Sequence, residues 1–278
     1  MAAHRRTTDP ARLEEIARTV REDIISMTAE AGSGHYMSSL SAVEILVALY
    51  FHELSYRPED PAWPGRDRFI LSKGHAAPAL YAVLARAGFF PVGELATLRR
   101  IDSRLQGHPV VHRLPGLDAS SGSLGQGLST GVGMALAARM DGRGSRVFVL
   151  LGDGELQEGQ VWEAAMAAAR FGLGNLTAIV DQNEFQATGR VREIMPVADL
   201  EGALRSFGWE VSSVDGHSFP ELLHSLTGGN GPGGKPRAVI ARTVKGCGIG
   251  FIEGNLKYHS APLAPGDLKR ARECLEGR

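Results

Sequence analysis

The chain has 278 residues, of which 43% are apolar and 22% charged, with a formal net charge of −1. This length and composition suit a globular α/β protein with a full core, and the balanced charge gives no general attraction for nucleic acids or anionic membranes. No secretory signal or apolar run of ~20 residues is evident in the sequence. Cys247 and Cys274 lack metal-binding spacing. We therefore expect a cytoplasmic protein with no membrane or nucleic-acid partner.

The periodicity of apolar residues predicts alternating helices and strands along the chain. Helical spacing predicts helices over 11–29, 41–51, 77–87, 93–100, 134–140, 156–171, 199–207 and 219–226, and a charged helix from 267. Short runs rich in β-branched and other apolar residues predict strands over 69–71, 147–151, 176–180, 209–214 and 238–244. Loops are expected over 31–39, 184–197 and 227–236. This alternation predicts a single domain over 1–278, a three-layer α/β/α sandwich with a mostly parallel sheet.

Three histidines directly follow a glycine in predicted turns: His35, His75 and His108. A single histidine of this kind is most simply explained as a loop residue that caps a helix. Three of them in one chain favour a shared polar site. The stretch 118–133 is rich in glycine and serine and leads into a predicted helix. Such a stretch either lets helices pack closely or exposes backbone N–H groups to an anion.

The stretch 146–189 reads as strand, glycine turn, helix and strand, which is a βαβ unit. Asp153 and Asn183 stand thirty positions apart, at the ends of the two strands. One carboxylate and one amide oxygen suit Mg²⁺ or Ca²⁺, and a carbonyl near Phe185 could add a ligand. A helix beginning near Glu155 would point its free N–H groups toward an anion bound at the same strand ends. Alternatively, Asp153 caps the helix and Asn183 turns a loop. The combined pattern favours a metal-bound diphosphate.

The segment GDGELQEG, together with the asparagine of DQN, resembles the thiamine diphosphate motif. Five further segments resemble transketolase segments, in the order of that family, and the resemblance covers nearly the whole chain. They are SGH at 33–35, LSKGHA at 71–76, QGHP at 106–109, SGSLGQG at 121–127 and KYHSAPL at 257–263. The resemblance implies the diphosphate-binding domain of the thiamine diphosphate-binding fold.

The resemblance also implies roles for individual residues. The metal, Mg²⁺ with Ca²⁺ or Mn²⁺ as substitutes, would be bound by Asp153, Asn183 and the carbonyl of Phe185. The cofactor would be contacted by Ser38, His75, Gly154 and Lys245, mainly near its diphosphate, and by the backbone of Gly122, Ser123 and Leu124. The substrate channel would be lined by His35, His108 and His259. Glu158 would join a carboxylate network between two active sites.

A full transketolase also carries a pyrimidine-binding domain and a C-terminal domain, which this sequence lacks. The resemblance therefore implies the N-terminal subunit of a split transketolase. With a partner subunit in an α2β2 heterotetramer, it would transfer a two-carbon ketol unit from a ketose or its phosphate to an aldose or its phosphate. Two alternatives remain open. One is another thiamine diphosphate enzyme, such as a 2-oxo acid dehydrogenase α subunit or a deoxyxylulose phosphate synthase. The other is a non-catalytic paralogue that regulates a partner.

Two positions depart from the pattern common in the family. After His35, where proline or glycines are common, the chain has Tyr36-Met37-Ser38-Ser39. These bulkier side chains could narrow the channel or contact an unusual substrate. Cys247 stands where a basic residue is common, which leaves the diphosphate contacts nearby open.

Overall fold

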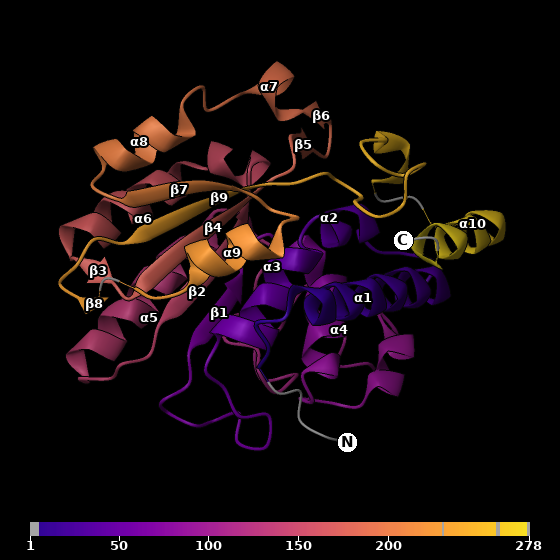
Figure 1. Ribbon diagram of the computed structural model, residues 1–278, viewed down its shortest axis with the longest axis horizontal. Coiled ribbons are helices and arrows are strands. Elements are labelled where there is room, and N and C mark those ends of the chain that lie inside the picture. Colours follow the sequence, from indigo (N-terminus) through magenta and orange to yellow (C-terminus); the bar gives the residue numbers. More distant parts are fainter. Residues whose placement is uncertain (1–5, 230, 260–261, 277–278) are drawn as a thin grey trace.

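The computed structural model describes residues 6–229, 231–259 and 262–276. Its centre is a five-stranded sheet in the order β1-β2-β4-β9-β7, and every neighbouring pair is parallel (Figure 1). The strands are β1 (Arg68–Leu71), β2 (Val147–Gly152), β4 (Leu176–Gln182), β7 (Glu210–Asp215) and β9 (Arg237–Arg242). Because all five run in one direction, their carboxyl ends meet at one edge of the sheet, where ligands bind in folds of this kind.

Two separate apolar cores cover the two faces of the sheet, which confirms the three-layer prediction. Along β2, Phe148 and Leu150 belong to one core, whereas Val147, Val149 and Leu151 belong to the other. Successive side chains of a strand point to opposite faces, so a continuous apolar strand is expected where both faces are covered. The first core includes residues of α1, α3, α4 and α9, and the second includes residues of α5, α6 and α8.

The helices mostly match the predicted ranges. The α-helices are α1 (Pro10–Glu30), α2 (Tyr36–Leu40), α3 (Val43–Ala48), α4 (Ala77–Arg86), α5 (Gln126–Met140), α6 (Gly159–Arg170), α7 (Val191–Ile194), α8 (Leu200–Ser206), α9 (Phe219–Leu226) and α10 (Pro265–Glu276). Shorter turns are the π-helical η1 (Leu49–Glu53) and the 3-10 turns η2 (Gly74–Ala76), η3 (Val92–Thr97), η4 (Gly154–Gln157) and η5 (Leu256–Tyr258). Asp9 caps α1 by accepting a hydrogen bond from the N–H of Ala11, as its position predicts.

The glycine-rich start of α5 was not predicted, and the helix begins at Gln126 instead of 134. Its small residues let it lie close to the sheet. A Cβ at Gly131 would lie 2.5 Å from Val149, and one at Gly127 would lie 2.3 Å from Ser72. Close packing on the strands therefore outweighs the low helix propensity of glycine. The second half of the segment 118–133 therefore serves close packing of the helix on the sheet.

Other local predictions also need correction. Residues 36–39, expected in a loop, belong to α2, because Tyr36, Met37 and Leu40 bury their side chains in the core. The helix expected over 41–51 is divided into α3 and η1. The loop expected over 184–197 contains α7 and an antiparallel hairpin of β5 (Phe185–Gln186) and β6 (Gly189–Arg190). In the loop expected over 227–236, β8 (Gly231–Pro232) pairs with β3 (Leu173–Gly174).

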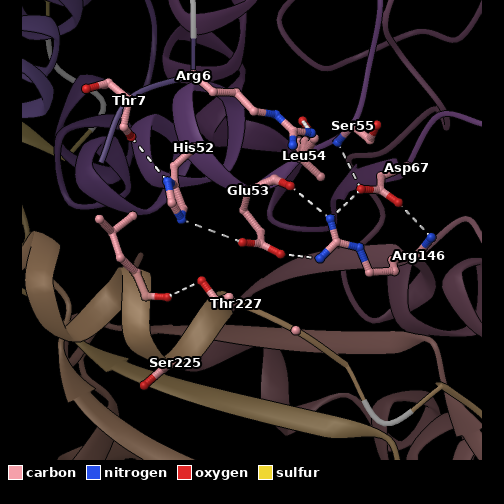
Figure 2. A network of polar contacts seen from close by, with 12 residues as sticks. Arg6, Thr7, His52, Glu53, Leu54, Ser55, Asp67, Arg146, Ser225 and Thr227 are labelled. Atoms are coloured by element: carbon pink, nitrogen blue, oxygen red, sulfur yellow. Dashed lines mark hydrogen bonds and ion pairs between the residues drawn. The ribbon is translucent and has the colours of Figure 1, made fainter. Parts of the chain in front are cut away.

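An ionic network fixes the amino ends of β1 and β2, opposite the edge where ligands are expected. Asp67 accepts hydrogen bonds from the N–H of Ser55 at 2.9 Å, from the N–H of Arg146 at 2.8 Å and from the Arg146 guanidinium at 2.6 Å. The same guanidinium pairs with Glu53, which stands 4.0 Å from the ring of His52. Figure 2 shows Glu53 and Asp67 meeting at Arg146. The network ties η1 to the first two strands and serves the fold.

Within the described part of the chain, no helix is both long and apolar enough to cross a membrane. α10 packs beside α1 at the end of the molecule opposite β3 and β8 (Figure 1).

We expect Asp67→Ala to lower the free energy of unfolding by about 3 kcal/mol, because it leaves the Arg146 guanidinium and two backbone N–H groups without their acceptor. Urea unfolding of the purified chain measures the change. Arg143→Ala is the matched control, since the Arg143–Asp141 pair is about half exposed on both sides, and it should cost less than about 1 kcal/mol. Equal effects of the two substitutions would contradict the role given to Asp67.

Candidate functional site

A pocket lies where the carboxyl ends of β1, β2, β4 and β9 meet. Its volume is ≈ 380 Å³. Thirteen of the fourteen residues singled out in the sequence line it: His35, Ser38, His75, His108, Gly122, Leu124, Asp153, Gly154, Glu158, Asn183, Phe185, Lys245 and His259. Ser123 does not line it. The pocket is also lined by six residues that were not predicted: Lys73, Gly152, Glu155, Gln157, Gln186 and Ala187. Segments from 35 to 259 thus form one site.

The end of the pocket at β2 and β4 carries oxygen ligands suited to a hard cation. Asp153 accepts hydrogen bonds from the N–H groups of Gly154 at 2.9 Å and Glu184 at 2.6 Å, and Asn183 Oδ1 accepts one from Phe185 N–H at 3.2 Å. Each of these oxygens keeps a further lone pair. Burial and the nearby Asp181 carboxylate raise the pKa of Asp153 to about 6. A bound cation would offset this cost, so the donor set fits a divalent metal.

The described residues contain no group of three or more His, Cys, Asp and Glu side chains that could hold a metal. A metal in this pocket therefore needs amide, carbonyl or ligand oxygens beside Asp153. Phe185 lines the pocket, but its carbonyl oxygen accepts a hydrogen bond from Lys245 Nζ at 2.9 Å. Burial and the charge of Lys73 lower the pKa of Lys245 to about 8. An anion in the pocket would stabilise this ammonium group.

The helix expected to begin near Glu155 and point its N–H groups at an anion is not there. The residues after Asp153 form the short turn η4, and α6 begins at Gly159 with Glu158 as its N-cap residue. The N–H of Gly154 donates to Asp153, and the N–H of Gly152 donates to Glu155 at 3.0 Å. That prediction was wrong because two acidic side chains already satisfy the backbone donors at this strand end.

Three histidines form a cluster in the pocket. The ring of His35 lies edge-on to His75, with centroids 5.3 Å apart, and to His259, with centroids 5.4 Å apart. Burial, and then neighbouring cations and imidazoles, lower the pKa of all three, to about 4 for His259 and well below the ordinary value for His75. The rings are therefore neutral near pH 7, and each can donate one hydrogen bond and accept another.

Two buried polar atoms in this pocket have no partner among the described residues: Ser38 Oγ and His259 Nδ1. Buried polar groups in native proteins are nearly always paired, so unpaired ones in a pocket indicate a ligand or water. Ser260 and Ala261, which belong to the 257–263 motif, lie outside the described residues. The unpaired atoms fit the prediction that a polar ligand with several oxygens occupies the site.

Close backbone contacts bring the glycine motifs together. Gly122 has a φ of +140°, and a Cβ there would lie 3.1 Å from the ring of His108. A Cβ at Gly74 would lie 2.7 Å from the backbone nitrogen of Gly122. A larger side chain at either position would push the segments 72–76, 106–109 and 121–124 apart. Glycine is therefore required at these two positions for the pocket to have its shape.

A buried ion pair below the pocket was not predicted from the sequence. Lys73 Nζ contacts the carboxylate of Asp181 and donates to the carbonyl of Ser38 at 3.1 Å. Asp181 also accepts hydrogen bonds from Ser41 at 2.7 Å and from Thr243. Both charged residues occur in quoted segments, LSKGHA and DQN, but their partners are far apart along the chain. The sequence signal that could have revealed this pair was a lysine and an aspartate, each placed at the end of a predicted buried strand.

Glu155 is the second buried group that sequence reasoning missed as a site residue. It is 3% exposed. Its carboxylate accepts hydrogen bonds from Ser72 Oγ, from the N–H of Gly125 at 2.8 Å and from the N–H of Gly152. Ser72 Oγ in turn accepts from the N–H of Gly127 at 3.2 Å. One side chain thus holds the ends of β1 and β2 and the start of α5 in register around the pocket.

The bulky side chains that follow His35, where proline or glycines are common in the family, do not narrow the pocket. Tyr36 and Met37 are 1% and 0% exposed, belong to the apolar core and do not line the pocket. The expectation that they could contact substrate was wrong, because α2 turns both side chains into the core. Cys247 does not line the pocket either, and its carbonyl accepts a hydrogen bond from Arg21 at 3.1 Å.

Comparison with protein families identifies the domain. The family model for the transketolase thiamine diphosphate-binding domain matches residues 13–276. The chain is 43% identical over 264 residues to a 6-deoxy-6-sulfo-D-fructose transketolase subunit of Clostridium sp. strain MSTE9, covering 95% of this chain and 96% of that subunit. It is 43% identical over 265 residues to an apulose-4-phosphate transketolase subunit of Actinobacillus succinogenes, with the same two coverages.

A solved structure agrees with the fold. The crystal structure of transketolase from Campylobacter jejuni superposes with a TM-score of 0.89 at 32% identity. The match covers 96% of this chain and 43% of that one. The chain thus spans less than half the length of this transketolase, and nearly the full length of the two subunits.

We expect Glu155→Gln to lower the free energy of unfolding by about 2 kcal/mol, because the amide offers one acceptor oxygen and turns an NH₂ group toward a backbone donor. Amide hydrogen exchange should also accelerate at Gly125 and Gly152, whose N–H groups it holds. Glu163→Gln, at an exposed position of α6, is the control and should change neither quantity. Unchanged exchange at Gly125 in Glu155→Gln would refute the assignment.

The raised pKa of Asp153 predicts a pH-dependent stability of the metal-free chain. The folded state holds this proton more tightly than the unfolded state, so stability is lost as pH rises from about 4 to 6. The loss reaches about 3 kcal/mol. Relative to wild type, Asp153→Asn should therefore gain about 2–3 kcal/mol between pH 4.5 and 7.5 in urea unfolding. Asp141→Asn, at an exposed position, should show no such trend. A pH-independent difference for Asp153→Asn would be the contrary result.

Proposed function

Because the chain belongs to the transketolase family, in its thiamine diphosphate-binding domain, we propose that it is one subunit of a transketolase. With its partner, it transfers a two-carbon ketol unit from a ketose or ketose phosphate to an aldose or aldose phosphate. The observation that carries this proposal is the pocket itself, in which oxygen ligands, two lysines and four histidines converge. Such a set suits a metal-bound diphosphate at one end and a polyhydroxylated substrate at the other.

The residues of the pocket fit thiamine diphosphate and Mg²⁺. Asp153, Asn183 and the carbonyl of Phe185 would hold the metal, and Lys245 would turn from that carbonyl toward the diphosphate. The further contacts that we propose come from Ser38, His75, Gly122, Leu124 and Gly154, which line the pocket, and from the backbone of Ser123. The bound cofactor supplies the carbanion equivalent that ketol transfer needs and that no side chain provides.

The histidines would orient the sugar and move its protons. His35, His108 and His259 line the pocket with lowered pKa values, so they are neutral imidazoles. A neutral imidazole can accept a proton from a sugar hydroxyl and return it from the same nitrogen, which is what reversible cleavage beside a hydroxyl requires. Glu158, beside the start of α6, would join a carboxylate network that reaches the second active site of the assembly.

A partner subunit would complete the site. Both similar proteins of the same length are named as transketolase subunits, and the Campylobacter jejuni enzyme is more than twice as long. We propose an α2β2 heterotetramer in which the partner supplies the pyrimidine-binding domain. The names of the two relatives specify a sulfonated sugar and a phosphorylated sugar, so we propose sugars with a terminal anion as substrates. The cysteines are free, which supports a cytoplasmic location.

Reconstitution tests this function. The chain mixed with its partner subunit, thiamine diphosphate and Mg²⁺ should transfer ketol units, whereas the chain alone should be inactive. Asp153→Ala should abolish Mg²⁺-dependent cofactor binding, measured by calorimetry, because it removes the only carboxylate among the proposed metal ligands. The control Asp141→Ala should bind normally. Full ketol transfer by the chain alone would disprove the need for a partner, and unchanged binding by Asp153→Ala would disprove the metal site.

A further inference from the structure

Lys245 lies in a tight turn that follows β9. The N–H of Cys247 donates to the carbonyl of Val244 at 3.0 Å, and Gly246 has a φ of +84°. A turn whose third residue adopts the left-handed conformation favours glycine at that position. Lys245 is the second residue of this turn, is 2% exposed, and donates from Nζ to the carbonyl of Phe185. The turn thus directs the lysine side chain from the end of the sheet into the pocket.

The charged end of Lys245 is held less firmly than that of Lys73. Lys73 pairs with the carboxylate of Asp181. In the part of the chain that the structure describes, no Asp or Glu side chain forms an ion pair with Lys245, and its hydrogen bond goes to a neutral carbonyl. A lysine carries its charge on a flexible four-carbon stem. The position of the Lys245 ammonium group therefore depends on how firmly the backbone of its turn is fixed.

Two side chains that do not line the pocket hold the two ends of this turn. His217, in the loop between β7 and α9, accepts a hydrogen bond at Nε2 from the N–H of Val244 at 2.9 Å. Arg21, in α1, donates from Nε to the carbonyl of Cys247 at 3.1 Å. The backbone is thus held one residue before Lys245 and two residues after it.

Glu44, in α3, joins these two side chains. Its Oε1 accepts a hydrogen bond from Arg21 Nη2 at 2.5 Å, and its Oε2 accepts one from His217 Nδ1 at 3.0 Å. Because His217 Nε2 accepts the N–H of Val244, Nδ1 carries the proton of the neutral ring. Burial alone would raise the pKa of Glu44, but Arg21 and His217 hold it below its ordinary value. The carboxylate therefore stays charged and keeps both partners in place.

We propose that His217 and Arg21, joined by Glu44, are positioning residues that fix the turn of Lys245 and so set the affinity of this chain for a diphosphate. The proposal rests on the proposed function, which assigns the diphosphate to Lys245. A charge-assisted hydrogen bond between an ammonium group and a phosphate oxygen is short and sensitive to position. A turn that is free to shift therefore weakens diphosphate binding, although every group that contacts the diphosphate is still present.

Amide hydrogen exchange of the purified chain tests the support itself. Loss of Arg21 or Glu44 would leave a buried charge unpaired, so His217 is the residue to vary. His217→Phe keeps a ring but removes the acceptor, and exchange at the N–H of Val244 should accelerate roughly tenfold. His217→Gln supplies a carbonyl oxygen and should restore much of the protection. His224→Phe, at an exposed position of α9, is the matched control. Unchanged exchange at Val244 in His217→Phe would overturn the proposal.

Calorimetric titration of the reconstituted pair with magnesium pyrophosphate tests the consequence for binding. His217→Phe should raise the Kd roughly tenfold, and Lys245→Met should raise it by at least as much. His217→Gln and His224→Phe should stay close to wild type. In a Lys245→Met background, His217→Phe should cause no further loss, because its effect passes through Lys245. An equal loss in both backgrounds would overturn the positioning role.

Kinetics of the pair separate positioning from a general loss of structure. His217→Phe should raise the thiamine diphosphate concentration needed for half-maximal rate and keep kcat at saturating cofactor within about twofold. A lower kcat with an unchanged cofactor requirement would instead indicate a structural role and contradict the proposal. Pyrophosphate binding by wild type without ketol transfer from any sugar would overturn the proposed function and leave the positioning role standing. Absence of pyrophosphate binding by wild type would overturn both.

Discussion

The ion pair of Lys73 and Asp181, buried beneath the pocket, is the interaction on which the site depends. Lys73 and Asp181 are 1% and 0% exposed. They join the ends of β1 and β4, and their hydrogen bonds with Ser38, Ser41 and Thr243 add the α2–α3 segment and the end of β9. Removing one member of such a pair leaves a buried charge and costs about 3–5 kcal/mol. Parallel strands alone bring these ends to one edge, but this pair fixes them relative to one another.

The same pair sets the electrostatics of the pocket. The carboxylate of Asp181 raises the pKa of Asp153, and the ammonium of Lys73 lowers the pKa of Lys245 and His75. Without a ligand, Asp153 and Lys245 each bear a charge that the buried surroundings disfavour. A divalent cation relieves the first and a diphosphate relieves the second, so the two are expected to bind together. The chain without metal and diphosphate is thus less stable than its packing alone would make it, as is common for proteins with binding sites.

The sequence was sufficient to predict the sheet and most of the residues that line the pocket. Continuous apolar strands such as Val147–Leu151 are recognisable from composition alone, and the glycine-histidine motifs converge as expected because each follows a strand or lies in a turn beside one. The start of α5 could not be predicted, since close packing on the sheet overrides the low helix propensity of glycine. The start of α2 was missed because it depends on the burial of Tyr36, Met37 and Leu40 in the core. Glu155 was missed for another reason. Its role comes from hydrogen bonds with Gly125 and Ser72, and these contacts exist only in the folded chain.

The central claim is that this chain holds a metal-bound diphosphate between Asp153, Asn183 and the carbonyl of Phe185. Anomalous diffraction from crystals grown with thiamine diphosphate and Mn²⁺ tests it most directly. We expect one strong manganese peak among these three groups, with Lys245 turned away from the Phe185 carbonyl. A peak elsewhere, or no peak while Lys245 still donates to that carbonyl, would contradict the account.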